Sequence, residues 1–182
     1  DDSEYKLNQY DLSNNRFVWV GNDIDDKFPE IDGTMITWRG GAAADDVEIY
    51  YWDLNDPVIR ALKNNTIQDT YPVISRNKIA WRAFDGNDWE IFYWDGSSTD
   101  TIMVTDNDYY DYNPVIDNDA IAWSGGDYPD SDIYYQSIGG STELVYDSEY
   151  FCNQPVLSKN KLMWGTNEDG QYEIYVAKKV VE

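Results

Sequence analysis

The stretch PVISRNKIAW, residues 72–81, occurs in three further versions, each with its proline and tryptophan in the same places. The other copies read PEIDGTMITW (29–38), PVIDNDAIAW (114–123) and PVLSKNKLMW (155–164). Successive copies are 41–43 residues apart, which is the period of four-stranded propeller blades. The repeat therefore predicts an all-β chain, a β-propeller of about four antiparallel blades.

Each repeat contains further strand-forming segments after the tryptophan. A second segment is rich in aromatic and β-branched residues and reads EIYYWD (48–53), EIFYWD (90–95), DIYYQS (132–137) and EIYVAK (173–178). A third follows in the first three repeats, beginning at Pro57, Asp100 and Thr142. The turn between the first two strands holds residues that tolerate φ > 0, such as Asp32-Gly33 and Arg76-Asn77. Each repeat is thus four short strands, here called A to D.

The chain is predicted to form a single propeller domain over residues 1–182. Its blades are expected at 29–69, 72–112, 114–150 and 155–182, preceded by N-terminal strands within residues 1–20. The last repeat ends after strand C, so a strand from residues 1–20 is expected to complete it and remove an exposed sheet edge. One strand is then surplus to four complete blades. The alternatives to a closed four-bladed propeller are a segment of a larger propeller, with a purely structural role, and an exchange of blades between chains.

Two further positions recur in every repeat. Trp38, Trp81, Trp123 and Trp164 end the B strands and are expected to fill the space between adjacent sheets, in preference to forming a ligand platform. Asp26, Asp69 and Asp111 stand three residues before each proline and are expected to accept backbone N–H bonds in the loops. Cys152 takes that position in the last repeat.

The order of these parts resembles the TolB-type propeller repeat over nearly the whole chain. The usual Ser-Pro-Asp-Gly turn is replaced here by ISRN, IDND, LSKN or IDGT, as in the variant repeats of many bacterial and archaeal surface proteins. TolB is a periplasmic protein that binds partner proteins through its propeller. The resemblance therefore implies a propeller that binds or scaffolds proteins and is extracellular, on the cell surface or periplasmic.

Composition excludes several classes of function. The chain has no histidine and one cysteine, so a Ser-His-Asp or Cys-His site is impossible within it, and we predict no catalytic residues and no enzyme activity. A formal net charge of −22 argues against nucleic-acid binding. No stretch approaches the roughly 20 apolar residues of a membrane span, so no membrane insertion is expected.

The acidic residues are predicted to gather on one face. In a four-stranded meander the B-to-C and D-to-A loops emerge together, and these loops carry most of the net negative charge. We expect a non-enzymatic module that binds a protein with a basic surface; the alternatives are a carbohydrate-binding propeller that uses exposed aromatics and a merely solubilising acidic surface. The candidate binding residues are Trp89, Tyr109, Tyr110, Tyr112, Tyr128, Tyr150, Asp85, Asp88, Asp106 and Asp108.

No cofactor or metal site is predicted. Runs of acidic and amide oxygens occur at 23–26, 85–88 and 106–108, and such oxygens suit Ca²⁺. None of these runs has the glycine and the terminal glutamate of a twelve-residue calcium loop. Calcium therefore stays an alternative to a site without metal.

Overall fold

The computed structural model describes residues 8–11, 13, 16–19, 25–43, 46–63, 65–127, 129–159 and 161–178. Within these ranges every regular element is a strand, and the seventeen strands form five antiparallel sheets. The N-terminal sheet contains β1 (Asn8–Asp11) and β2 (Arg16–Trp19). Blade 1 contains β3 (Lys27–Asp32), β4 (Met35–Ala43), β5 (Asp46–Asp53) and β6 (Arg60–Ala61). No membrane-spanning helix is found among the described residues.

The remaining strands form three more blades. Blade 2 contains β7 (Asp69–Ser75), β8 (Lys78–Phe84), β9 (Trp89–Trp94) and β10 (Ile102–Met103). Blade 3 contains β11 (Asp111–Asp117), β12 (Ala120–Gly125), β13 (Asp132–Ser137) and β14 (Thr142–Tyr146). Blade 4 contains β15 (Cys152–Ser158), β16 (Lys161–Glu168) and β17 (Gln171–Lys178). In every blade the strands pair in chain order, which confirms the predicted meander and the all-β propeller fold.

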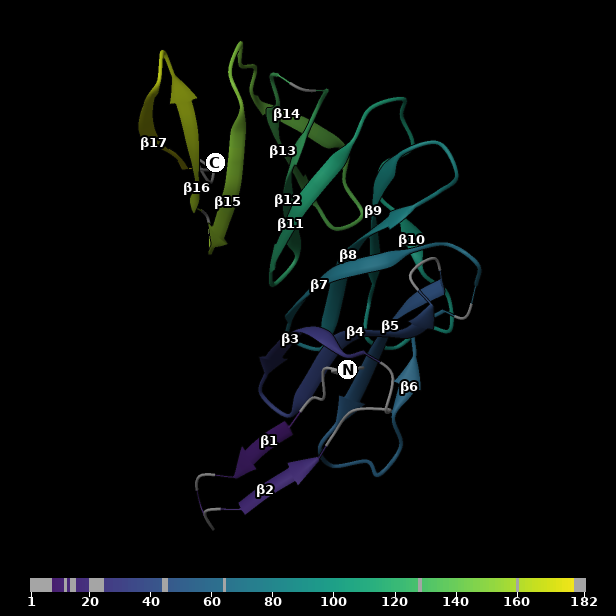
Figure 1. The fold of residues 1–182 in the computed structure, drawn as a ribbon. Helices are drawn as coiled ribbons and strands as arrows, with labels where there is room; N and C mark the ends of the chain where they lie inside the picture. Colours follow the sequence, from purple (N-terminus) through teal and green to yellow (C-terminus); the bar gives the residue numbers. More distant parts are fainter. Residues whose placement is uncertain are drawn as a thin grey trace.

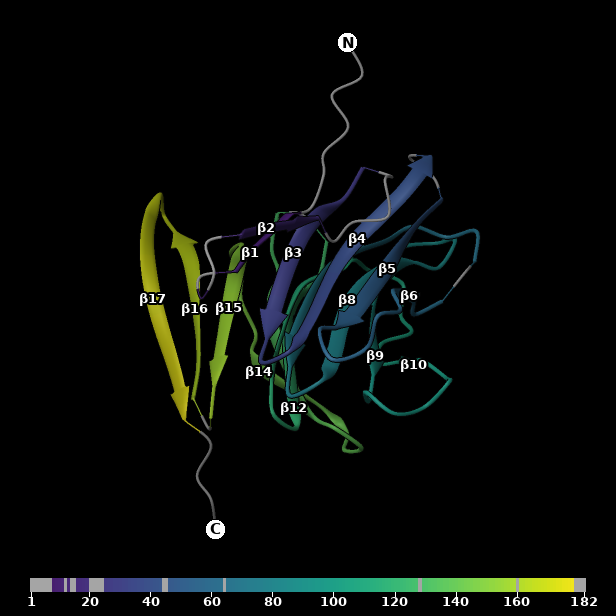
Figure 2. The ribbon, with the colours of Figure 1, turned by 90° about the horizontal axis from the view of Figure 1, so that it is seen from below.

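The four blades lie side by side in chain order along an arc (Figure 1). The first strands of consecutive blades, β3, β7, β11 and β15, contact one another, so they form the inner edge of the arc. Figure 2 shows β3 and β15 from below, with the other strands of each blade extending away from them. This arrangement brings equivalent loops of successive blades together.

The hairpin β1–β2 differs from the predicted closure. β2 pairs with β1 over four residues, and in the described part of the chain no strand joins the outer edge of β17. In Figure 1 the hairpin lies near β3, at the other end of the arc from β17. Pairing within a hairpin closes a very short loop, whereas joining β17 would bring the two ends of the chain together, and this makes the local pairing cheaper in chain entropy. The surplus strand is therefore the hairpin partner of β2.

The A-to-B turns have the backbone conformation that their residues indicate. Arg76 and Asn77 have φ of 49° and 65°, and Asn118 has φ of 56°. These turns also join neighbouring blades, because the Asn118 N–H donates to Ser75 Oγ at 3.1 Å and the Lys159 N–H donates to Asp117 Oδ2. The turns therefore hold successive blades in register as well as reversing the chain.

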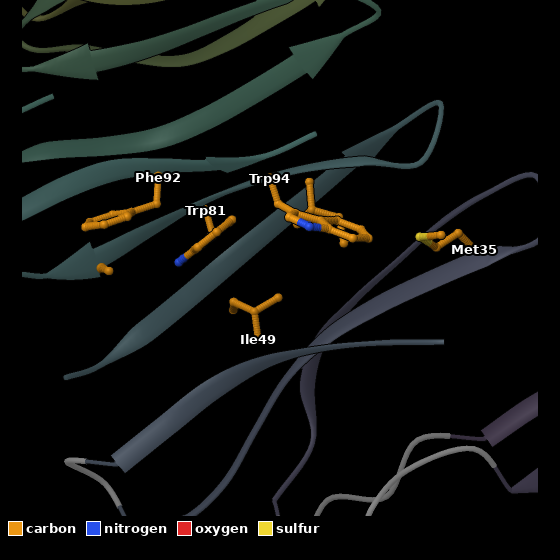
Figure 3. Close-up of a cluster of buried hydrophobic side chains, with 7 residues drawn as sticks. Met35, Ile49, Trp81, Phe92 and Trp94 are labelled. Atoms are coloured by element: carbon orange, nitrogen blue, oxygen red, sulfur yellow. The ribbon is translucent and has the colours of Figure 1, made fainter. Parts of the chain in front are cut away.

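The core consists of three clusters, each lying between two neighbouring blades. In the first, Met35 and Ile49 of blade 1 pack against Trp81, Phe92 and Trp94 of blade 2 (Figure 3). Trp81 and its equivalents Trp38, Trp123 and Trp164 are no more than 5% exposed. The predicted burial between sheets is therefore confirmed for Trp81, Trp123 and Trp164, which belong to these clusters. Trp38 is buried as well.

Two of the three recurring aspartates, Asp69 and Asp111, have a different role from the one predicted. Asp69 Oδ1 accepts the indole N–H of Trp81 at 3.0 Å, and Asp111 Oδ1 accepts that of Trp123 at the same distance. Each carboxylate thus satisfies the one polar group of a buried tryptophan, where we had expected backbone N–H donors. Cys152 replaces this carboxylate in blade 4, and within the described residues the buried Trp164 Nε1 has no hydrogen-bond partner.

Candidate functional site

The B-to-C and D-to-A loops lie at the same end of the blades, here called the loop face. In blades 1 to 3 an acidic residue near the start of the C strand accepts a backbone N–H from the following D-to-A loop. Asn107 N donates to Glu90 Oε1 at 2.8 Å, and Ser148 N donates to Asp132 Oδ1 at 2.9 Å. Among the described residues of these loops, the exposed acidic ones are Asp85, Asp106, Asp108, Asp127, Asp130, Asp147, Glu149 and Asp169.

Buried carboxyl groups lie under the loop face where two blades meet. Asp111 of blade 3 is fully buried, accepts the Asn107 amide at 2.8 Å and lies beside Glu90 of blade 2. Burial raises the pKa of Asp111 to about 6, even though the hydrogen bonds it accepts act in the opposite direction. Burial and the neighbouring Glu90 also raise the pKa of Asp88 to about 6. These two carboxyl groups therefore keep their protons to a higher pH than a free aspartate does.

The predicted acidic residues divide between turn-forming and exposed positions. Asp85 Oδ1 accepts the N–H groups of Asn87 and Asp88 at 2.8 and 3.1 Å, so it caps the B-to-C turn. Asp88 is 2% exposed and does not reach the surface. Carboxylate oxygens of Asp85, Glu90 and Asp106 lie within 4.8 Å of one another. Asp85 accepts hydrogen bonds within the turn, and Glu90 accepts one from Asn107 N, so both carboxylates already have a structural role. We therefore assign no metal ion to them.

The predicted aromatics mostly contact other side chains. Tyr112 stacks on Phe151 with ring centroids 6.0 Å apart, and the Tyr150 hydroxyl donates to Asp169 at 3.4 Å. Trp89 lies under the Arg82 guanidinium, and Tyr109 stacks on Tyr134. Tyr110 is exposed, and Tyr128 lies outside the described residues. These rings do not form a common platform.

The loop face contains an acidic pocket between the D-to-A loops and the start of β13. Its volume is about 320 Å³. Tyr109 and Tyr134 form one part of its lining, with ring centroids 6.2 Å apart and their hydroxyls 3.3 Å apart. The lining also includes four carboxylates, which belong to Asp127, Asp130, Asp132 and Asp147. The four carboxylates give this pocket a negative charge that suits a cationic side chain.

Of the predicted residues that the structure describes, Tyr109 lines this pocket. Asp127 and Asp130 are in a B-to-C loop, and Asp147 is in a D-to-A loop. The predicted proximity of these two kinds of loop was the one feature of the sequence that indicated that these residues would lie close together. No local motif marks any of the three, because they converge only when blade 3 folds and the loops around it meet.

Comparisons with known proteins identify the fold. No protein-family model matches the chain, and a search of curated proteins finds no match. Among solved structures, TolB from Acinetobacter baumannii aligns over 96% of this chain with a TM-score of 0.69 and 16% identity. The chain has a TolB-like β-propeller fold. A putative TolB from Agrobacterium tumefaciens aligns over 81% of this chain, with a TM-score of 0.65 and 15% identity.

The TolB-like fold extends beyond this chain in those structures. The chain spans 46% and 58% of the length of the two TolB chains. The β-propeller domain of the Trilobed protease from Pyrococcus furiosus also aligns, over 74% of this chain and 43% of that one, with a TM-score of 0.60 and 11% identity. At these identities the likeness concerns the fold, and function has to be argued from the residues.

A backbone irregularity at the inner edge of the arc was not predicted from the sequence. The residue before each repeat proline has positive φ, as in Phe28 (53°) and Tyr71 (52°), and the strand pairing shifts register there. Phe28 stacks on Tyr71 at 4.3 Å, and the Arg82 guanidinium lies 4.5 Å from Tyr71 and 4.6 Å from Trp89. This irregularity thus brings together four side chains from blades 1 and 2. One of them is Trp89, which packs against Arg82.

Gly125 provides the room for the buried carboxylate at this site. A Cβ added at Gly125 would lie 2.2 Å from Asp111 Oδ1 and 3.0 Å from the Tyr134 ring. We expect Gly125→Ala to lower the free energy of unfolding by about 1–3 kcal/mol, because overpacking displaces the carboxylate that holds Trp123. Urea unfolding followed by circular dichroism measures this. Gly139→Ala is a poor control because of its positive φ, so Ser141→Ala, exposed in blade 3, serves instead.

Proposed function

We propose that this chain is a non-enzymatic binding module of a secreted, cell-surface or periplasmic protein, and that its loop face holds a basic protein segment. The observation that carries the proposal is the pocket formed by four carboxylates and two tyrosines. An arginine or lysine side chain placed there meets carboxylate acceptors and the faces of aromatic rings. Charge-assisted hydrogen bonds and cation–π contacts both favour such a cation.

The surroundings of the pocket support the same type of partner. Exposed carboxylates surround it on three blades, at Asp106, Asp108, Glu149 and Asp169 among others. Together with the net charge of −22, they attract a basic partner at long range and increase its rate of association. The interaction energy then comes from the few residues that line the pocket.

A role without catalysis is supported by the sequence and by the structural comparisons. The 182 residues contain no histidine, so the serines that line the pocket, Ser131 and Ser148, have no imidazole base in this chain. The solved structures that align include TolB, and also peptidases such as an acylaminoacyl peptidase, of which this chain spans 29%.

Binding of a labelled Arg-rich peptide tests the proposal directly. We expect the affinity to fall as NaCl is raised from about 0.05 M to about 0.5 M, because the contacts are ionic. Replacing two pocket carboxylates, Asp127→Asn and Asp130→Asn, should weaken binding about tenfold, which corresponds to about 1.4 kcal/mol. Fluorescence anisotropy gives both values, and a peptide with citrulline in place of arginine separates charge from shape.

The matched control changes the same number of charges away from the loop face. Asp100 and Glu143 are exposed on the C-to-D side of blades 2 and 3, so Asp100→Asn with Glu143→Gln alters net charge equally. Binding by this control variant should stay within about twofold of the parent. Equal losses in the two double variants would show that net charge alone attracts the peptide, and the pocket assignment would be wrong.

A further inference from the structure

Arg82 is a half-buried cation without an acidic partner in a chain whose net charge is −22. Within the described part of the chain its guanidinium forms no ion pair and no hydrogen bond, and its Nε is a buried donor without an acceptor. Three other basic side chains, Lys27, Arg60 and Lys78, each lie against an aspartate. A partly desolvated charge is costly when it lacks a counter-ion, so Arg82 keeps its bonding capacity for a group from outside the chain.

The guanidinium of Arg82 is held by two aromatic rings. Its central carbon lies 4.5 Å from the ring centroid of Tyr71 and 4.6 Å from that of Trp89. Such cation–π contacts restrict the orientation of the guanidinium and leave its N–H groups free to donate. Burial lowers the pKa of Arg82, but an arginine still stays charged at neutral pH. The side chain is therefore a charged, planar donor in a fixed place.

This donor can be reached from the inner edge of the arc. Tyr71, which contacts the guanidinium, is 41% exposed, and Phe28 of blade 1 stacks on it at 4.3 Å and is 37% exposed. Arg82 itself is partly exposed. A ligand that bonds to the N–H groups of Arg82 therefore also meets open aromatic surface.

A pocket without acidic residues lies on the other side of the same site. Its volume is about 500 Å³, and its described lining residues are Thr66, Ile67, Gln68, Phe84, Gly86 and Trp89. Phe84 meets Trp89 edge-on, with ring centroids 5.7 Å apart. Trp89 thus takes part both in this pocket and in the contact with Arg82. The acidic pocket of blade 3, by contrast, is lined by four carboxylates.

We propose that Arg82 and the pocket beside Trp89 bind the C-terminal residue of a peptide. The planar fork of an arginine matches a carboxylate with two parallel hydrogen bonds, so the free carboxylate of the peptide lies on Arg82. An apolar side chain of the same residue lies in the pocket against Ile67, Phe84 and Trp89. This site differs from the acidic pocket in its place and in the charge of its ligand, and so it does not rest on the proposed binding of a basic segment.

A C-terminal residue fits this arrangement better than an internal acidic one. In a C-terminal residue the carboxylate and the side chain are attached to the same carbon, and the site has a cation and an apolar pocket that share Trp89. In an internal aspartate or glutamate the carboxylate is itself the side chain, which leaves the pocket empty. A sugar acid would bring hydroxyl groups, whose hydrogen bonds a mostly apolar lining does not replace.

Titration calorimetry with small probes tests the proposal. We expect N-acetyl-phenylalanine, which has a free carboxylate, to bind with a dissociation constant of about 1 mM or below. Its amide, N-acetyl-phenylalaninamide, keeps the ring without the charge and should bind at least about tenfold more weakly. N-acetyl-glycine keeps the carboxylate without the ring and should also bind about tenfold more weakly. Equal affinity for the acid and the amide, or tighter binding of glucuronate than of N-acetyl-phenylalanine, would overturn the assignment.

Variants of Arg82 show whether its planar fork is the cause. Arg82→Lys keeps the charge and loses the fork, so it should bind N-acetyl-phenylalanine about tenfold more weakly, and Arg82→Gln should bind it more weakly still. The matched control Arg76→Gln removes the same charge from an exposed turn at the other end of blade 2 and should bind within about twofold of the parent. Circular dichroism checks that each variant is folded. Unchanged binding by a folded Arg82→Lys variant would show that the fork is not used.

NMR of the parent chain gives a second measurement that needs no variant to fold. The Nε–H of Arg82 has no acceptor in the described chain, so its resonance should shift when N-acetyl-phenylalanine is added and should stay in place with the amide. A resonance that responds equally to both probes would count against a carboxylate on Arg82.

The outcome is separable from the binding of a basic segment. Arg82 does not line the acidic pocket, so Arg82→Lys should bind the Arg-rich peptide as the parent does. The double variant Asp127→Asn with Asp130→Asn should in turn bind N-acetyl-phenylalanine within about twofold of the parent. Either proposal can therefore fail while the other holds.

Discussion

Replacing Trp81 with alanine is expected to lower the free energy of unfolding by about 3–5 kcal/mol. Trp81 is 1% exposed, its ring packs between blades 1 and 2, and its indole N–H donates to the buried Asp69. The variant leaves a cavity in the interface and also removes the donor from a buried carboxylate, and both effects act in the same direction. Urea unfolding followed by circular dichroism measures the loss without relying on the indole signal.

Two further variants show whether position in the interface is the cause. Ile102→Ala, at a residue 54% exposed on β10, should change stability by less than about 0.5 kcal/mol. Trp164→Ala should cost less than Trp81→Ala, because Trp164 has no indole partner among the described residues and its removal leaves no buried carboxylate without a donor. Equal costs at Trp81 and Ile102 would contradict the assignment of Trp81 to the core.

Stability is expected to rise as pH falls from 8 to 5. The pKa of Asp111 is about 6 in the folded chain and about 3.9 when unfolded, so the folded state binds more protons between these values. The stabilising contribution is therefore complete below the unfolded pKa and is lost as pH rises through 6. Asp111 alone makes unfolding about 1–2 kcal/mol costlier at pH 5 than at pH 8. Burial raises the pKa of Asp69 and Glu90 as well, which adds in the same sense.

The variant Asp111→Asn tests this assignment. Asparagine keeps an oxygen that accepts the Trp123 indole N–H and has no proton to lose, so the pH dependence should flatten. Asp100→Asn, at an exposed residue, should leave the dependence as in the parent. A parent chain that becomes more stable from pH 5 to pH 8, or an Asp111→Asn variant with an unchanged slope, would contradict the role of the buried carboxyl.

Local sequence patterns were enough to predict the blades. Each strand and turn is specified by residues within a few positions of one another, as in the Arg76-Asn77 turn with its two positive φ angles. The Pro-to-Trp spacing placed every interface tryptophan, because the same residue in each repeat meets the same neighbouring sheet. The two N-terminal strands were also located correctly. Their pairing was not, because β2 could pair either with the neighbouring β1 or with the distant β17, and it pairs with β1.

The candidate site was predicted less completely. The proximity of B-to-C and D-to-A loops follows from the meander, and so the acidic loop face could be expected. The pairing of Asp69 with Trp81 has the same twelve-residue spacing as that of Asp111 with Trp123, so the repeat carried a signal for it that the sequence reasoning did not use. The meeting of Asp127, Asp130 and Asp147 around Tyr109 and Tyr134 joins residues from different loops and has no such repeated signal. Sequence reasoning also placed Asp88 among the candidate binding residues, whereas its side chain is 2% exposed.

The amino-acid sequence alone specified the strands, their order within each blade and the concentration of negative charge in two sets of loops, because these depend on near neighbours and on meander geometry. The tertiary structure decided which members of a repeated pattern are buried. Ile133 and Ile174 stand in the same local context, but one is fully covered and the other is 77% exposed. A side chain is buried only where another sheet packs against its face of the blade. The residues around it in the sequence do not indicate whether such a sheet is present.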